Sequence, residues 1–172
     1  PQRRSILARA VPLEENYNLV IGRLSKPGPL LPETKAFALR QFRTTIPAWT
    51  WLLPDVQAMA DGFRLRLDSL NDSSADASLV RWYWHLGRGQ HKEAAQELAN
   101  AMRMLPGDLS AENFRDIYSY LIVAKNYPMA AKIRVAAAEQ HPQVNQRADF
   151  DMLDRLLKRN SGILIDKVTT AN

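Results

Sequence analysis

Cysteine is missing from this 172-residue sequence. The chain can therefore form no disulfide, offers no thiol nucleophile and cannot build a zinc site on cysteine ligands, although this absence fits any cellular compartment. No apolar run approaches the roughly 18 residues that a membrane-spanning helix requires. Sustained alternation of apolar and polar residues, the pattern of a half-buried strand, is missing too. These absences indicate an all-α protein without a transmembrane segment, and they leave its localisation open.

The sequence also has few residues that suit catalysis or metal binding. The three histidines, His85, His91 and His141, lie at spacings that match no metal-binding motif. It has neither a Ser-His-Asp order nor a glycine-rich phosphate loop. Asp149 and Asp151 are acidic neighbours, but we expect them in polar surroundings with no partner that would shift their pKa. We therefore expect no enzyme, no metal and no cofactor.

The formal net charge of +5 is unevenly distributed. Residues 1–71 hold 10 Lys and Arg against 6 Asp and Glu, or +4, whereas residues 72–172 hold 13 against 12, or +1. A basic first half favours nucleic acid, anionic lipid or an acidic protein as partner, while a plain solvated surface explains the same excess. Its arginines are Arg3, Arg4, Arg9, Arg23, Arg40, Arg43, Arg64 and Arg66.

The domain organisation follows from the helix breakers. Residues 1–31 are expected to form an N-terminal arm, because Pro27-Gly28-Pro29 interrupts regular structure. An α-helical domain is expected over residues 32–172, with the polar segment 71–76 as a candidate internal boundary. The sequence starts Pro-Gln-Arg-Arg, without an initiator methionine or a signal-peptide core, and we expect it to be an excised domain or a processed product of a larger protein.

Helical periodicity begins at Pro32. Proline suits the first position of a helix, and Pro47 ends this one. The clearest amphipathic pattern runs from Val56 to Leu70, where apolar residues recur at steps of three and four. Further helices are expected at residues 77–88, 91–104, 110–124, 128–140 and 145–159.

Two tryptophans lie two residues apart on one of these helices, at Trp82 and Trp84. Two residues turn a helix by about 200°, so both side chains cannot share one face. We expect one of them to be less buried or to meet another element, and we expect the first half of the chain to pack against the later helices.

One pattern occurs twice in the second half of the chain. A small residue is followed by another small residue seven positions later and by a proline five positions after that. The first copy is Ala94, Ala101 and Pro106, and the second is Ala130, Ala137 and Pro142. Two helices approach closely only where small side chains face each other, and proline ends the second helix so that the next can reverse. The pattern therefore predicts two helical hairpins.

Residues 75–142 resemble the tetratricopeptide family, whose unit is a helix-turn-helix of about 34 residues. In this resemblance Gly89 lies at the turn of the first unit, and Tyr127 matches the aromatic residue that follows the turn of the second. The closing prolines lie 36 residues apart, so the loop at 107–109 absorbs extra residues. The resemblance implies stacked helical hairpins, an α-solenoid with flanking helices. Another α-helical repeat or bundle is also compatible with the pattern.

The resemblance further implies that the first helix of each unit lines a concave groove that binds a peptide or protein segment. By register the groove residues are Asp76, Leu79 and Tyr83 from the first unit and Glu112, Arg115 and Ser119 from the second, with Arg147 and Asp151 from the next helix. In the alternative interpretation Leu79 and Tyr83 are core residues, and the charged residues are ordinary solvated surface.

The function expected from these observations is a non-enzymatic scaffold for protein–protein interaction within a larger complex. In its mechanism a bound peptide would bury apolar side chains against Leu79 and Tyr83, while Glu112 and Arg115 would set its register by charge. The alternative is a nucleic-acid-binding helical domain that uses its basic N-terminal half.

Overall fold

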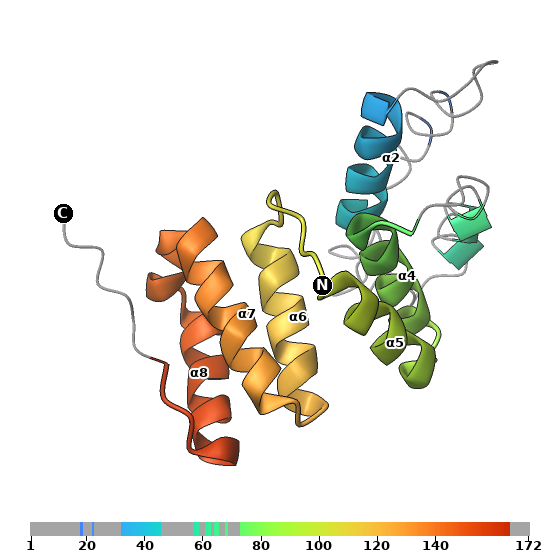
Figure 1. Cartoon of the computed structure of the whole chain (residues 1–172). Helices are drawn as coiled ribbons and strands as arrows, with labels where there is room; N and C mark the ends of the chain where they lie inside the picture. The colour runs from blue at the N-terminus through green and yellow to red at the C-terminus, as the bar shows by residue number, and fades with distance from the viewer. Residues whose placement is uncertain are drawn as a thin grey trace, which may run out of the picture. The chain divides into compact units, whose positions relative to one another are not determined.

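The computed structural model describes residues 32–45 and 73–165, together with positions 18, 22, 57, 58, 61, 62, 64, 65 and 68 (Figure 1). Its regular elements within these residues are helices, with no strand among them, which confirms the all-α prediction. The chain divides into two compact units, Pro1–Pro106 and Gly107–Asn172, here called unit 1 and unit 2. The break follows the proline that closes the first hairpin, and positions 73–76 of the expected boundary segment fall inside unit 1.

Among the described residues, unit 1 includes three helices with described bounds: α2 (Pro32–Thr45), α4 (Ala75–Gly87) and α5 (His91–Ala101). Helix α2 matches the expected span, with proline at its start and an acidic residue in its first turn. Helix α4 begins two residues before the expected position, because the Ser74 hydroxyl accepts a hydrogen bond from the Ala77 N–H at 3.3 Å and caps the helix there.

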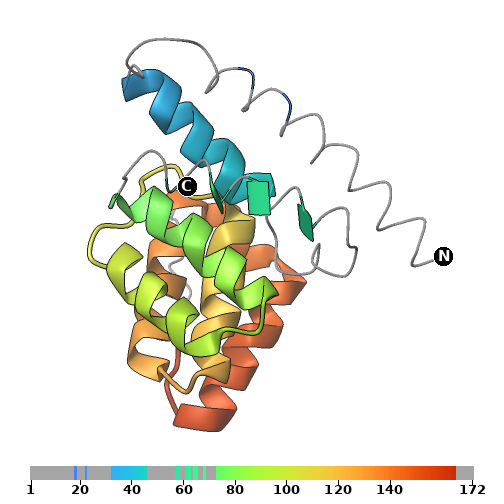
Figure 2. The ribbon, with the colours of Figure 1, turned by 90° about the vertical axis from the view of Figure 1, so that its right-hand side faces the viewer.

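Helices α4 and α5 form the first predicted hairpin, and α4 also packs against α2 (Figure 2). Gly89 makes the turn in the left-handed region, with φ 69°, where a side chain would be strained. Ala94, Leu98 and Ala101 are buried on α5, so the small residues of the pattern do lie inside the unit. Helix α5 ends at Ala101 rather than at residue 104.

The two tryptophans of α4 differ as expected. Trp82 is fully buried, whereas Trp84 is half-buried. The indole N–H of Trp84 donates to a carboxylate oxygen of Asp61 at 3.0 Å, and the Arg64 guanidinium lies 4.6 Å from its ring centroid. Both partners precede α4 in the chain, which confirms that part of the first half packs against the hairpin.

The remaining expectations for the first half fall largely outside the described residues. The arm at 1–31 and the segment around Pro47 lie there, as do most residues of the amphipathic pattern from Val56 to Leu70. The described positions between 57 and 68 are all helical.

Unit 2 contains α6 (Ala111–Val123), α7 (Tyr127–Gln140), the 3-10 helix η2 (Pro142–Gln146) and α8 (Ala148–Ser161). A reciprocal capping box between Ser110 and Asn113 starts α6. Gly162, with φ 73°, ends α8 at the expected place. The expected helix at 145–159 starts too early, because residues 142–146 form a separate 3-10 turn and Arg147 has extended backbone before α8.

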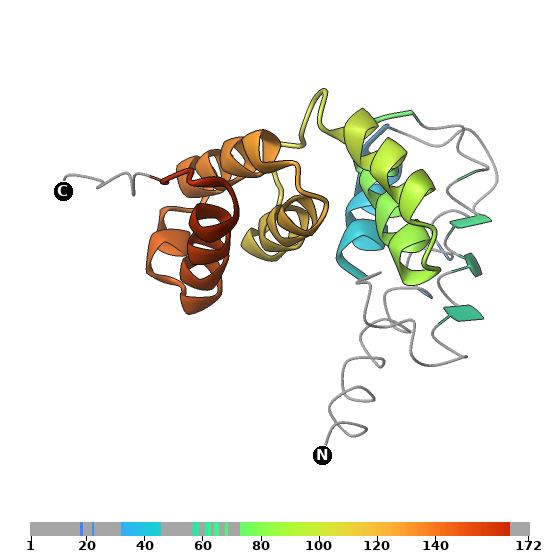
Figure 3. The same ribbon diagram turned by 90° about the horizontal axis from the view of Figure 1, so that it is seen from below.

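Helix α6 contacts both α7 and α8, and the three helices enclose the interior of unit 2 (Figure 3). Ala130 and Ala137 of the second small-residue pattern are fully buried. Larger side chains fill the rest of this interior, among them Phe114, Ile117 and Phe150, all fully buried.

The two hairpins repeat with a spacing of 36 residues. Helix α4 spans 75–87 and α6 spans 111–123, while α5 begins at His91 and α7 at Tyr127. The position of Gly89 is taken by Lys125, which also has a positive φ, of 58°. The same hydrogen bond closes both turns, from the N–H of Gln90 to the carbonyl of His85 and from the N–H of Asn126 to that of Leu121, each at 2.9 Å.

Candidate partner-binding face

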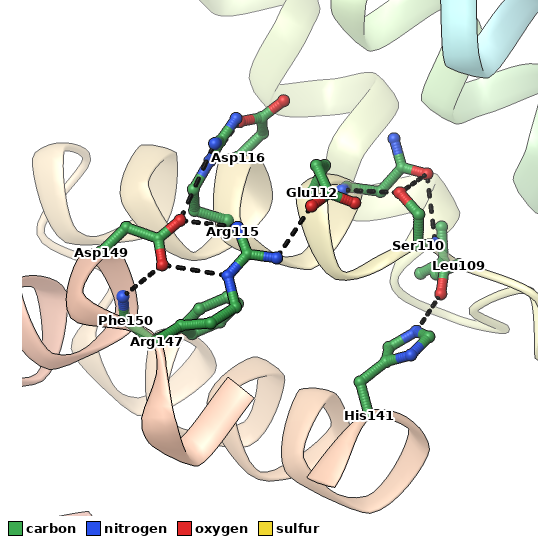
Figure 4. Close-up of polar contacts among 10 residues, drawn as sticks. Leu109, Ser110, Glu112, Arg115, Asp116, His141, Arg147, Asp149 and Phe150 are labelled. Atoms are coloured by element: carbon green, nitrogen blue, oxygen red, sulfur yellow. Dashed lines mark hydrogen bonds and ion pairs between the residues drawn. The ribbon is translucent and has the colours of Figure 1, made fainter. Parts of the chain in front are cut away.

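Three of the charged residues that the sequence proposes for a groove meet in unit 2. Glu112 and Arg115 extend from the first half of α6, and Arg147 is the residue directly before α8 (Figure 4). With Asp116 and Asp149 they form a continuous set of ion pairs, here called the ion-pair network.

Arg147 is the centre of the ion-pair network. Its guanidinium donates to Glu112 at 2.8 Å on one side, and to the two carboxylate oxygens of Asp149 at 2.7 and 3.1 Å on the other. Arg115 donates to Asp116 at 2.8 Å and lies 3.8 Å from Asp149. The bidentate contact to Asp149 fixes the plane of the Arg147 guanidinium, which a single-point contact would not do.

Local structure holds these side chains in place. Glu112 lies in the first turn of α6, and Asp149 lies in the first turn of α8, where the positive end of a helix stabilises a carboxylate. The backbone N–H of Phe150 donates to Asp149 at 3.0 Å. The segment that leads into α6 is tied to the rest of the unit because the His141 imidazole is hydrogen-bonded to the Leu109 carbonyl (Figure 4).

The network keeps its carboxylates ionised. The hydrogen bond from Arg147 lowers the pKa of Glu112 and also that of Asp149. In return, the hydrogen bonds to Asp149 and Glu112 raise the pKa of Arg147. The expectation that Asp149 has no partner able to shift its pKa is therefore wrong. Arg147 lies only two residues before it, and the extended backbone between η2 and α8 turns the two side chains together.

Two other proposed groove residues of this unit lie apart from the centre of the network. Ser119 is half-buried on α6, about two helical turns after Glu112. Asp151 follows Asp149 by two residues on α8, so it points about 200° away around the helix.

The three proposed groove residues of unit 1 are placed differently. Leu79 and Tyr83 have 0% and 2% of their surface exposed, so they are core residues, as the alternative interpretation had it. Their burial follows from the position of α4, which packs against both α5 and α2. Asp76 is partly exposed and forms an ion pair with Arg43 of α2, whose side chain is buried.

The described arginines of the basic N-terminal half differ in their exposure to a partner. Arg43 is buried and Arg64 forms an ion pair with Asp68 at 3.1 Å, whereas Arg40 is exposed. The other arginines of the set lie outside the described residues, at positions 3, 4, 9, 23 and 66.

A buried polar cluster in unit 2 escaped sequence reasoning. Arg134 of α7 is fully buried and donates to both carboxylate oxygens of Asp154, at 3.0 and 3.1 Å, and to Asn145 at 3.0 Å. The Tyr118 hydroxyl donates to the same aspartate at 2.9 Å, and burial together with the Asp154 charge raises the pKa of that phenol. A signal was present in the sequence, since Arg134 falls on the apolar stripe of α7, four residues after Ala130.

In the part of the chain that the structure describes, no group of three His, Asp or Glu side chains is arranged to hold a metal ion. No helix among the described residues is long and apolar enough to cross a bilayer. In comparisons with known proteins, no protein-family model, no curated protein and no solved structure matches the chain.

Proposed function

We propose that this chain is a non-enzymatic scaffold for protein–protein interaction, and that a partner segment binds to unit 2 on the face that carries the ion-pair network. One observation carries the proposal. Glu112 and Arg115 come from α6 and Arg147 comes from the bend before α8, yet the three residues meet at one place on the surface.

The repeated hairpin supports the proposed architecture. Helix bounds, turn conformation and turn hydrogen bonds recur at a spacing of 36 residues. Proteins built from such repeated hairpins use the first helix of each unit as a binding surface. In unit 2 that helix is α6, and the neighbouring α8 extends the surface. On this proposal the chain is a tetratricopeptide-like scaffold, and its partner is a protein or peptide.

The exposure of the network allows it to contact a partner. The side chain of Glu112 is 59% exposed and that of Arg115 is 38% exposed. A cationic side chain of a partner can therefore approach Glu112, while a carboxylate can approach Arg115. Surface ion pairs of this kind add only about 0–1 kcal/mol to stability, so the network can be altered without unfolding the protein. Charge at such a surface sets the orientation of the partner and its rate of association.

The experiment compares two charge reversals that change net charge equally. Arg115→Glu alters the network, whereas Lys132→Glu alters an exposed residue of α7. Immobilised wild-type protein and both variants are exposed to an extract of the source cells, after circular dichroism has shown that each variant is folded. We expect a protein that is retained by the wild type and by Lys132→Glu but lost by Arg115→Glu. Its affinity is then measured directly with purified components.

Equal retention by all three proteins would exclude the proposed face. Retention of nucleic acid instead of protein, weakening steeply with salt, would favour the nucleic-acid-binding alternative.

A further inference from the structure

Helix α8 has apolar side chains on its buried face and on its exposed side. Phe150, Leu153 and Leu157 point into unit 2 and are buried. Met152 and Leu156 lie on a neighbouring side of the helix and are 57% and 38% exposed. These two residues are one helical turn apart, so they form a continuous apolar strip on the outside of the helix.

A shallow hollow follows this strip, and its described lining comes from α8 alone: Ala148, Asp151, Met152, Arg155, Leu156 and Arg159. We call these residues the outer face of α8. The spacing of three and four residues is the one by which a second helix packs into the grooves of the first. The outer face therefore has the form of one half of a helix pair.

Charge is divided along α8. The first half carries Asp149, Asp151 and Asp154, and the second half carries Arg155, Lys158 and Arg159. Within the described residues the three cations of the second half have no hydrogen-bond or ion-pair partner, although all three are exposed. Asp149 and Asp154 pair with Arg147 and Arg134 inside unit 2, so Asp151 is the acidic residue of the outer face. Two antiparallel copies of α8 would set Asp151 of each against the basic half of the other.

We propose that the outer face of α8 binds the outer face of α8 in a second copy of this chain, antiparallel and about a two-fold axis. In this register Met152 lies against Leu156 of the second copy. Asp151 then lies within one turn of Arg155 of the second copy, and the symmetry repeats both contacts. Parallel pairing would bring like charges together, which disfavours that arrangement.

The size of the face predicts the strength of the dimer. A helix of 14 residues is about 21 Å long, so one helix face lies at the low end of specific interfaces. The dimer is therefore expected to form in the micromolar range, and to exchange rapidly with the monomer.

The test is analytical ultracentrifugation of the whole chain at about 1 to 500 µM, a range that spans the expected dissociation constant. The mass should rise from the monomer value of 19.5 kDa towards twice that value. Leu156→Asp should remain monomeric, because it places a charge in the centre of the contact. Val135→Asp, at an exposed apolar residue of α7, is the matched control and should dimerise as the wild type does.

A charge exchange tests the antiparallel register and keeps the test valid if Leu156→Asp fails to fold. Arg155→Asp and Asp151→Arg should each weaken self-association at least tenfold, since each sets like charges against one another. A mixture of these two variants should form a heterodimer about as strong as the wild-type dimer. A wild type that stays monomeric throughout, a dimer that survives Leu156→Asp, or a mixture that does not associate would each overturn the proposal. The outcome is independent of the partner-binding test on α6.

Discussion

The two hairpins have the same local structure but use the same positions in opposite ways. In unit 1 the positions of Leu79 and Tyr83 are buried, because α4 packs against both α5 and α2. In unit 2 the equivalent positions hold Arg115 and Ser119, which remain partly exposed. A repeated backbone therefore does not imply a repeated surface. What covers the first helix decides whether its side chains become core or remain exposed.

One feature is common to both units. The first turn of α4 carries Asp76, and the equivalent residue of α6 is Glu112. Each pairs with an arginine from a different part of its own unit, Arg43 in unit 1 and Arg147 in unit 2. The difference is burial, since the Arg43 side chain is 2% exposed and that of Arg147 is 28% exposed.

The largest expected effect would break unit 2 at its buried cluster. Asp154→Ala removes the carboxylate that pairs with Arg134 and leaves the buried guanidinium without its counter-charge. Loss of one partner of a buried ion pair costs about 3–5 kcal/mol, and urea unfolding should show that loss. The control is Asp116→Ala in the exposed network of the same unit, which should cost about 1 kcal/mol or less. Equal losses for both variants would contradict the central role of Arg134.

An intermediate effect tests the equivalence of the two turns. Gly89 and Lys125 both have positive φ, and a β-carbon at Gly89 would meet no atom within 4 Å. Gly89→Ala should therefore destabilise the protein by about 1 kcal/mol through backbone strain alone. Lys125→Gly should stabilise it by up to about 1 kcal/mol, because it relieves the same strain in the second turn.

Thermal unfolding of the two single variants and of the double variant measures both effects. Opposite signs and near-additive values are expected, since the two turns lie in different units. Changes of the same sign in both variants would show that the turns are not equivalent.

The smallest effect concerns the pH dependence of the exposed network. The folded-state pKa values of Glu112 and Asp149 are lowered from 4.5 and 3.8. Their ionised forms therefore contribute stability above those ordinary values, and this contribution is lost as pH falls through the lowered values. Arg147→Ala should reduce stability slightly at pH 7, and the difference from the wild type should shrink below about pH 4.

Denaturant midpoints measured from pH 7 down to about pH 3 check this prediction. Lys132→Ala, at an exposed residue of α7, is the control, because its cation has no carboxylate partner among the described residues. A gap between Arg147→Ala and wild type that widens in acid would show that the network does not depend on its carboxylates.

Much of the local structure could be predicted from the sequence. Proline and serine near helix starts, glycine at a turn and apolar residues at steps of three and four indicate helices by short-range physics. The small residues at Ala94 and Ala130 marked the close contact within each hairpin. The 3-10 turn before α8 was missed because Pro142 was predicted only to end the second hairpin, and a 3-10 turn of five residues is too short to show a periodicity of its own.

The candidate site was predictable only in part. Register alone selected Glu112, Arg115 and Arg147, since these residues follow from the repeat. The same register wrongly placed Leu79 and Tyr83 in an open groove, because periodicity says which residues share a helix face but not what packs against it. Asp149 was misjudged because its partner lies across a backbone bend.

The sequence by itself determined that the chain is helical, where most helices begin and end, and that one hairpin occurs twice. These properties depend on backbone dihedrals and on neighbours within a few residues. Only the tertiary structure decided that Leu79 is core while Arg115 is exposed, and that Arg134 and Asp154 pair in the interior. Burial and pairing depend on side chains that are distant in the chain, and packing alone brings those side chains together.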